Sequence, residues 1–347
     1  MPLVNMKALI TRAKSNQKGV GAFNVGNMEM IIGAIKAAEE TNTPIIMQIA
    51  ESRFKHSPLE LIGPMMVSAA KRSKVDVAVH LDHGQSLDAV KLALSLGFTS
   101  VMFDGSSLPY EENIKRTKEV VSIARKYNAS VEAELGHVGG SEDGSKDIKA
   151  LYTDPNKALD FVNQTGVDFL AVAIGNAHGV YKEAPKLAFD VLDKIASTVS
   201  IPLVLHGGSG ITDAEFQKLI KHGITKVNIA TASFLSLTKE AEAYLKNNDK
   251  LSIKFVFVDD STETLDYVIN ENDDYGEIYG FKCMSVNDAL EFRFKADLKN
   301  DIIDSFEIYK GSTLLGKLKN TDRKLSVDVD YIYSKDSDYV EEVRKYR

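Results

Sequence analysis

The sequence has 347 residues with 42 Lys and Arg against 49 Asp and Glu, a formal net charge of −7, and 44% of its residues are hydrophobic. These values are ordinary for a soluble globular protein, exclude a disordered or fibrous chain, and make nucleic acid an unexpected partner because no basic face is available. The single cysteine, Cys283, excludes an internal disulfide and a thiolate-rich metal site, so any metal must be held by histidine and carboxylate.

The sequence predicts neither a membrane span nor a targeting signal. No apolar run approaches the ~18 residues of a membrane-spanning helix, and the first residues, "MPLVNMKALITRAK", lack the apolar stretch of a signal peptide. We therefore expect a cytoplasmic protein with no membrane partner.

Short apolar runs recur along the first 245 residues and predict eight strands. In chain order they are "GVGAFNV" (19–25), "TPIIMQIA" (43–50), "DVAVHLDHG" (76–84), "SVMFDGS" (100–106), "ASVEAELG" (129–136), "FLAVAIG" (169–175), "IPLVLHGGS" (201–209) and "KVNIATA" (226–232). Between them lie amphipathic segments such as "SLDAVKLALSLG", which end in glycine as helices do. This alternation predicts an α/β fold, a (β/α)₈ TIM barrel, over residues 1–247. The alternative, a doubly wound open sheet, lacks its Gly-x-Gly-x-x-Gly turn after the first run.

Every predicted strand is followed by a polar or ionisable residue. They are Asn24, Glu51 with Ser52, Asp82 with His83, Asp104, Glu134, His178, His206 and Asn228. Because the carboxyl ends of barrel strands meet at one face, these groups are expected to converge on a single site.

Three of these groups are histidines, His83, His178 and His206. A single histidine at a strand end is more often a hydrogen-bonded structural residue than a ligand. Three on one rim, with an open fourth position, have the composition of a catalytic zinc centre. His80 lies two residues before Asp82 on the same strand face, which predicts a supporting neighbour of the site rather than a ligand.

Glycine-rich turns predict a phosphate site after the seventh and eighth strands. "HGGSG" (206–210), including Gly207, and Gly179 free backbone N–H groups there, and Ser209, Asn228 and Thr231 add polar groups. Lys182 either supplies a point charge or is a solvated loop lysine. By itself a Gly-Gly-Ser-Gly sequence is more often a simple turn.

The loop "GHVGGSEDGSKDIKALYTDP" (136–155) is long, glycine-rich and charged. Such a loop over an active face is typical of a lid, and Glu142 or Asp143 could bring an acid/base group to the site on closure. The alternative is a solvated loop.

Five motifs, "HLDHG", "VEAELGHVGGSEDG", "AVAIGNAHGVY", "PLVLHGGSGI" and "KVNIATA", occur in this order over residues 2–245. The sequence here resembles the zinc-dependent class II ketose-bisphosphate aldolases, closer to the tagatose-bisphosphate branch than to the long fructose-bisphosphate branch. The resemblance implies reversible cleavage of a fructose- or tagatose-type 1,6-bisphosphate to dihydroxyacetone phosphate and glyceraldehyde 3-phosphate in carbohydrate metabolism, including glycolysis. It implies Zn²⁺, a monovalent cation (Na⁺ or K⁺), and a homodimer or homotetramer.

The same resemblance assigns roles to individual positions. His83, His178 and His206 match the zinc ligands, Glu134 an alternate metal ligand, Asp82 the acid/base at the bond being cleaved, and Glu142 the lid glutamate. Gly179, Lys182, Gly207, Ser209, Asn228 and Thr231 match positions around a phosphate, and Asn24 and Asp104 match polar residues that line the site.

Two departures from the family pattern stand out. Ala50 occupies a position where the family usually has a small hydroxyl residue, and Ala230 one that some fructose-type members make acidic. Residues 246–347 carry 16 Lys and Arg against 22 Asp and Glu and hold 8 of the 13 tyrosines. Their strand-like alternation predicts a small mainly β domain over 248–347, of unknown role and partner.

Three functions are therefore considered. The first is an active zinc aldolase. The second is a barrel with impaired or no catalysis that acts as a metal- and sugar-phosphate-binding scaffold fused to a β interaction domain. The third, a zinc hydrolase of the amidohydrolase kind, lacks the expected His-x-His pair in "AFNVGN".

Overall fold

The computed structural model describes residues 2–139, 152–179, 181 and 185–248, and the backbone of the strands between residues 250 and 343. The chain divides into two compact units, Met1–Leu237 and Thr238–Arg347, which are described separately.

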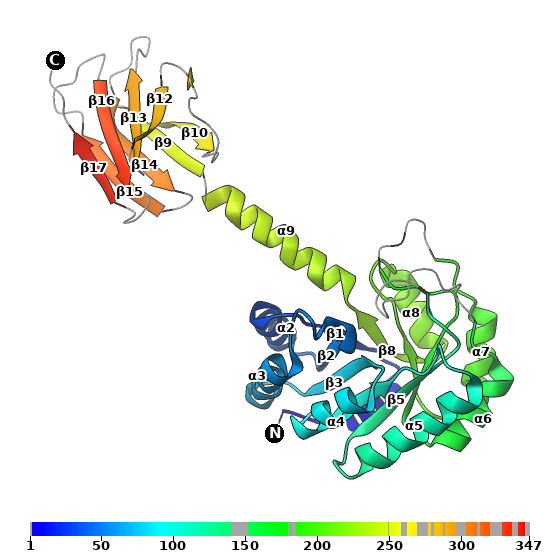
Figure 1. Ribbon diagram of the computed structural model, residues 1–347. Coiled ribbons are helices and arrows are strands. Elements are labelled where there is room, and N and C mark those ends of the chain that lie inside the picture. Colours follow the sequence, from blue (N-terminus) through cyan, green and yellow to red (C-terminus); the bar gives the residue numbers. More distant parts are fainter. Residues whose placement is uncertain are drawn as a thin grey trace. The chain divides into compact units, whose positions relative to one another are not determined.

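The first unit is a closed barrel of eight parallel strands in chain order, each paired with the next and β1 with β8 (Figure 1). The strands are β1 (Val20–Asn24), β2 (Ile45–Ala50), β3 (Val77–Gly84), β4 (Ser100–Phe103), β5 (Ser130–Leu135), β6 (Phe169–Val172), β7 (Leu203–Leu205) and β8 (Ile224–Ile229). The predicted (β/α)₈ barrel is confirmed.

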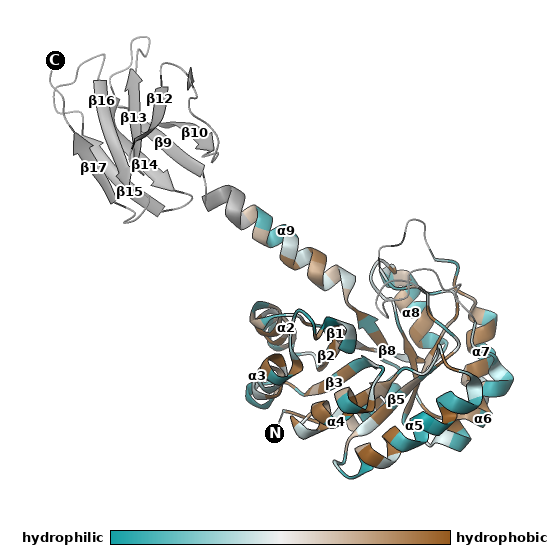
Figure 2. Ribbon diagram, in the orientation of Figure 1, coloured by the Kyte–Doolittle hydropathy of each residue, from teal (hydrophilic) through white to brown (hydrophobic). Residues whose placement is uncertain are grey.

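Most of the helices connect successive barrel strands. The helices are α1 (Met6–Ser15), α2 (Met28–Glu40), α3 (Leu59–Arg72), α4 (Leu87–Ser95), α5 (Tyr110–Arg125), α6 (Pro155–Thr165), α7 (Phe189–Thr198), α8 (Asp213–Lys221) and α9 (Thr231–Asn248), with a short 3₁₀ turn η1 (Glu51–Arg53). Side chains satisfy several helix N-termini: Asn27 accepts a hydrogen bond from the backbone of Met30, and Thr212 forms a capping box with Glu215. In Figure 2 teal and brown residues alternate along α5 and α6, as expected for helices with one face toward a core.

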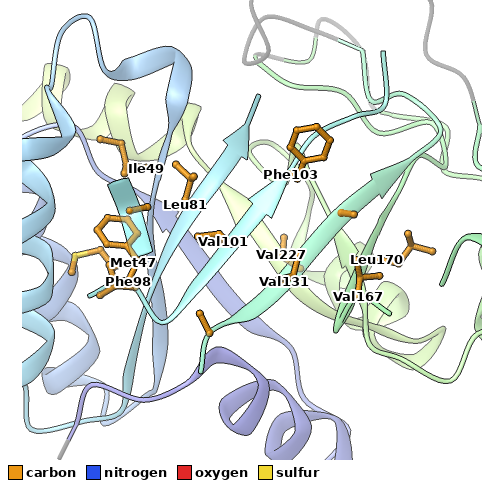
Figure 3. Packing of buried hydrophobic residues seen from close by; sticks show 14 of the residues in the cluster. Met47, Ile49, Leu81, Phe98, Val101, Phe103, Val131, Val167, Leu170 and Val227 are labelled. Carbon is orange, nitrogen blue, oxygen red and sulfur yellow. The ribbon is translucent and has the colours of Figure 1, made fainter. Parts of the chain in front are cut away.

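Because successive side chains of a strand point to opposite faces, the core of the barrel has two layers. Outward-facing residues such as Met47, Leu81 and Val131 pack beneath the helices (Figure 3). Inward-facing residues such as Ile46 and Phe169 form a second cluster with Met6, Leu9 and Ile10 of α1. Helix α1 thus closes the N-terminal end of the barrel, which leaves the polar residues at the opposite, carboxyl end.

In the second unit the residues that the structure describes form nine strands in two antiparallel sheets, with orders β10-β9-β14-β15 and β11-β12-β13-β16-β17. They are β9 (Lys250–Phe257), β10 (Thr262–Val268), β11 (Glu277–Ile278), β12 (Phe281–Val286), β13 (Ala289–Lys295), β14 (Ile303–Lys310), β15 (Thr313–Lys319), β16 (Asp328–Ser334) and β17 (Tyr339–Val343). Among the described residues, none of the helices has the length and apolarity that crossing a membrane requires.

Candidate metal centre and active site

Three histidine rings converge at the carboxyl end of the barrel. His83 Nε2 lies 3.2 Å from His178 Nε2 and 2.9 Å from His206 Nδ1. All three side chains are buried, and one ring nitrogen from each lies within 4.8 Å of the others. The structure therefore brings together the three histidines that the sequence proposes as metal ligands, although they are separated by 95 and 123 residues from His83 along the chain.

The backbone of β3 explains how two adjacent residues both face this site. In a regular strand Asp82 and His83 would point to opposite faces. His83 instead has a φ of 42°, in the left-handed region, and the pairing of β3 with β4 shifts register between Leu81 and Gly84. Such a conformation is costly for a residue other than glycine and is typical of functional sites.

Carboxylates orient two of the three rings by hydrogen bonds to the ring nitrogens that face away from the cluster. Asp104 Oδ2 lies 2.7 Å from His83 Nδ1, and Glu132 Oε1 lies 2.8 Å from His206 Nε2. A carboxylate accepts the ring N–H on its side, so the other nitrogen of each ring presents its lone pair to the cluster. Asp104 is itself fixed by the backbone N–H and the hydroxyl of Ser106.

The donor set fits a divalent cation. Nitrogen lone pairs at these separations repel one another unless a proton or a cation lies among them. Glu134 Oε2 lies 3.7 Å from His206 Nδ1 and has no hydrogen-bond partner among the described residues. Three imidazoles with an adjacent carboxylate suit zinc, and His83, Asp104 and Glu134 form a second, overlapping group of ligand atoms.

The charge states of the rings are consistent with metal binding. Burial, together with the charge of His83, lowers the pKa of His178 and of His206. Burial also acts to lower the pKa of His83, but Asp82 and Asp104 outweigh it and raise that pKa. Burial and the nearby Asp104 raise the pKa of Glu134. The carboxylates of Asp82 and Asp104 thus favour a positive charge at His83, and a metal ion held by the three rings would meet the same carboxylates.

Asp82 is a buried carboxylate held by amides on both oxygens. Asn24 Nδ2 donates to Asp82 Oδ2 and Asn228 Nδ2 donates to Asp82 Oδ1, each at 2.9 Å. Burial would raise the pKa of Asp82, but the charges of His83, His206 and Lys226 outweigh it and hold the pKa below its ordinary value. Asp82 is thus ionised and held in one orientation next to the histidine cluster, where its oxygens can accept a proton.

The side chains of Asn24 and Asn228 therefore point into the barrel toward Asp82. The sequence proposes both for substrate binding. Asn228 also accepts a hydrogen bond from Gly208 N through its backbone oxygen, which ties the loop after β7 to β8.

The other proposed phosphate-binding residues lie around that loop. Gly207 has a φ of +66°, and a Cβ there would lie 2.1 Å from Ala177 O, so only glycine allows the loops after β6 and β7 to approach this closely. Ser209 Oγ accepts a hydrogen bond from Ala232 N in the first turn of α9, the helix that Thr231 begins. Gly179 follows His178 with a φ of 99°. Lys182 and Glu142 lie outside the described residues.

Two further residues that the sequence analysis names have structural partners. His80 Nδ1 lies 2.8 Å from Ser100 Oγ and His80 Nε2 lies 3.6 Å from Glu132 Oε2, and burial with the charge of Lys226 lowers the pKa of His80 to about 3. Glu51 accepts hydrogen bonds from Gln85 and Ser86, at the start of α4.

Sequence reasoning misses three buried polar residues of the barrel interior. They are Gln48, Glu132 and Lys226, each 0% exposed. Gln48 Nε2 donates to Asn24 Oδ1 at 2.7 Å, and Lys226 Nζ lies 2.8 Å from Glu132 Oε2. A signal for Glu132 and Lys226 is present in the sequence, because each lies two residues before a proposed site residue and so shares its strand face.

The chain is similar to known proteins over most of its length. The sequence profile of the family "Fructose-bisphosphate aldolase class-II" matches residues 4–274. The fructose-bisphosphate aldolase of Staphylococcus aureus strain Mu50 is 41% identical over 253 residues, covering 72% of this chain and 88% of its own length. That of Geobacillus stearothermophilus is 40% identical over 250 residues, covering 71% of this chain and 86% of its own length.

A solved structure shows the same fold. The crystal structure of the YdjI aldolase from Escherichia coli K12 superposes with a TM-score of 0.62 at 39% identity, and the match covers 71% of this chain and 86% of that one. The chain therefore belongs to the class-II fructose-bisphosphate aldolase family, a family of carbon–carbon lyases.

Proposed function

We propose that this chain is a zinc-dependent aldolase that reversibly cleaves a ketose 1,6-bisphosphate, of the fructose or tagatose type, into dihydroxyacetone phosphate and glyceraldehyde 3-phosphate. The observation that carries the proposal is the convergence of three histidine nitrogens, with one pair 2.9 Å apart, beside the buried carboxylate of Asp82. This arrangement suits a reaction that needs both a cation and a proton-transfer group.

In this proposal His83, His178 and His206 hold zinc, and Glu134 is an alternate ligand. Bound zinc acts as a Lewis acid that stabilises the negative charge developing on the ketose carbonyl oxygen when the carbon–carbon bond breaks. Asp82 takes the proton from the hydroxyl group next to that bond, and the amides of Asn24 and Asn228 keep its carboxylate in place.

Further assignments rest on the family pattern. Glu142 carries the proton exchange on the dihydroxyacetone-phosphate carbon. Gly179, Lys182, Gly207, Ser209 and Thr231 bind the phosphate, with a monovalent cation nearby. The left-handed glycines and the N-terminus of α9 support a phosphate there, because exposed backbone N–H groups attract anions. The reaction takes place in the cytoplasm.

The test is the release of triose phosphate from fructose 1,6-bisphosphate and from tagatose 1,6-bisphosphate by the purified chain, with zinc measured by atomic absorption. We expect about one zinc per chain, turnover of at least one of the two sugars, and loss of activity with a chelator. Full activity after exhaustive metal removal would contradict the proposal.

The same assay distinguishes the enzyme from the second candidate function, a barrel that binds metal and sugar phosphate without catalysis. Ala50, in place of the family's small hydroxyl residue, is buried on β2 directly before η1, so the second strand offers no hydroxyl at that position. A chain that binds zinc but turns over neither sugar supports a binding scaffold instead of an enzyme.

A further inference from the structure

A buried lysine lies in the middle of the barrel. Lys226 on β8 is 0% exposed and is among the largest fully buried side chains of the described residues. Its ammonium group lies 2.8 Å from Glu132 Oε2 and donates to Asn228 Oδ1 at 2.7 Å. A charge is kept in such a core only when it is paired and hydrogen-bonded, and Glu132 supplies the opposite charge while Asn228 supplies a hydrogen-bond acceptor.

The first contact leads to the metal centre. Glu132 uses one oxygen for Lys226 and the other for His206 Nε2, at 2.8 Å. Because the paired carboxylate can only accept, the proton of the His206 ring lies on Nε2 and the Nδ1 lone pair faces His83. Lys226 thus holds the carboxylate of Glu132 in the orientation in which one of its oxygens meets the ring.

The second contact leads to the acid/base residue. An ammonium group has only donors, so it determines that Asn228 turns its amide oxygen toward Lys226 and its amide nitrogen toward Asp82. With the amide reversed, the nitrogen would face another donor and Asp82 would lose one of its two hydrogen bonds.

We propose that Lys226 is a positioning residue that orients His206 through Glu132 and Asp82 through Asn228, and so aligns the metal centre with the proton-transfer group. The inference rests on the proposed function. Among the described residues Lys226 has no hydrogen bond or ion pair with the three histidines, and its part in the reaction is to set the orientation of His206 and Asp82.

The informative variant is the double substitution Lys226→Met/Glu132→Gln. Either single substitution leaves an unpaired buried charge, which destabilises a core strongly. The double variant removes both charges. The glutamine that replaces Glu132 keeps an oxygen that can accept from His206, but nothing then fixes which end of its amide faces the ring. Removal of such an outer partner typically weakens metal binding by about 10- to 100-fold.

The measurements are zinc affinity by competition with a chelator, the visible absorption spectrum of the Co²⁺-substituted protein, and kcat and KM at saturating zinc. For the double variant we expect zinc affinity to fall at least ~10-fold, the Co²⁺ spectrum to change, and kcat to fall with little change in KM. The spectrum reports the ligand geometry directly and does not depend on turnover.

Asp168→Asn is the matched control. Its side chain is 1% exposed and pairs with Lys7 and Arg125 at 2.8 Å and 2.7 Å, away from the histidine cluster. This variant also loses a buried carboxylate, yet zinc affinity, the Co²⁺ spectrum and kcat are expected to match those of the wild type.

Two results would overturn the inference. A double variant with wild-type zinc affinity, Co²⁺ spectrum and kcat would show that Lys226 only balances the charge of Glu132. Borohydride trapping of substrate on Lys226 would show that the lysine itself reacts with the carbonyl group. If the wild-type chain binds neither zinc nor cobalt, the proposed function fails as well, and this outcome is distinguishable because it requires no variant.

Discussion

The surroundings of Asp82 suit the proton-transfer role that we propose for it. Each of its oxygens already receives a hydrogen bond from an amide, and the positively charged groups around it keep the carboxylate ionised despite its burial. The carboxylate therefore has its direction fixed before substrate arrives, which lowers the cost of reorganisation during the reaction.

Asp82→Asn tests that role. The amide is similar in size but does not transfer protons, so kcat is expected to fall by about 10²- to 10⁴-fold while zinc stays bound at one per chain. The measurement is kcat at saturating zinc together with metal content. A fall in kcat of less than about tenfold, well below the range for general acid–base catalysis, would remove Asp82 from the chemistry.

Asp168 contributes to stability in a way that depends on pH. It accepts hydrogen bonds from Arg125, Lys7 and the backbone of Val131, and although burial acts to raise its pKa, these partners lower it. A carboxyl group with a lowered pKa stabilises the fold above its unfolded-state pKa of about 4, and this contribution is lost as the pH falls through the folded-state pKa.

For Asp168→Asn we therefore expect the free energy of unfolding to fall by about 1–2 kcal/mol at pH 7, since both cations are half exposed and water replaces part of the interaction. The difference from the wild type should shrink as the pH drops below about 4. Urea unfolding at a series of pH values measures this. A difference that stays constant with pH would contradict the argument.

At the scale of elements, the sequence predicts the eight strands and their order because each has a continuous apolar run flanked by turn residues. It does not predict which way His83 points, since strand alternation alone would turn it away from Asp82 and only the left-handed backbone reverses this. Lys226 and Glu132 are missed for another reason: inside an apolar run a charged residue suggests an exposed position, and only the closed barrel supplies each with a buried partner.

The next prediction concerns Gly207, in the loop after β7. In Gly207→Ala the new Cβ would meet Ala177 O, and the residue would need to keep a φ of +66°. We expect a loss of at least about 1–3 kcal/mol in the free energy of unfolding and weaker zinc binding, because the two loops that carry His178 and His206 must separate.

Gly33→Ala is the control for that change. Gly33 lies inside α2, where an added Cβ would have no atom within 4 Å, and its φ is not positive. The substitution should therefore stabilise by about 0.5–1 kcal/mol and leave zinc affinity unchanged. Thermal unfolding measures the stability of the two variants, and chelator competition measures their zinc affinity. Equal effects of the two substitutions would show that close approach at Gly207 is unimportant.

At the scale of the whole molecule, we propose that residues 1–247 and 248–347 are separate domains. The first compact unit ends at Leu237, within α9, whereas the shift in composition toward acidic and tyrosine residues comes about ten residues later. A helix that continues across a domain boundary is a common form of linker, and its stability then depends on packing at each end.

Zinc binding tests whether the two units are separate domains. All proposed ligands lie in the first unit, so a ligand that binds only the folded barrel should stabilise that unit alone. With free zinc at 100 times its dissociation constant the gain is about 2.7 kcal/mol, which corresponds to a rise of roughly 5–10 °C in the Tm of a domain of this size. Differential scanning calorimetry should show two transitions, only one of which moves with zinc and returns on addition of a chelator. A single transition that shifts as a whole would mean that the two units unfold together, and His206→Ala, which removes one ligand, should abolish the shift in either case.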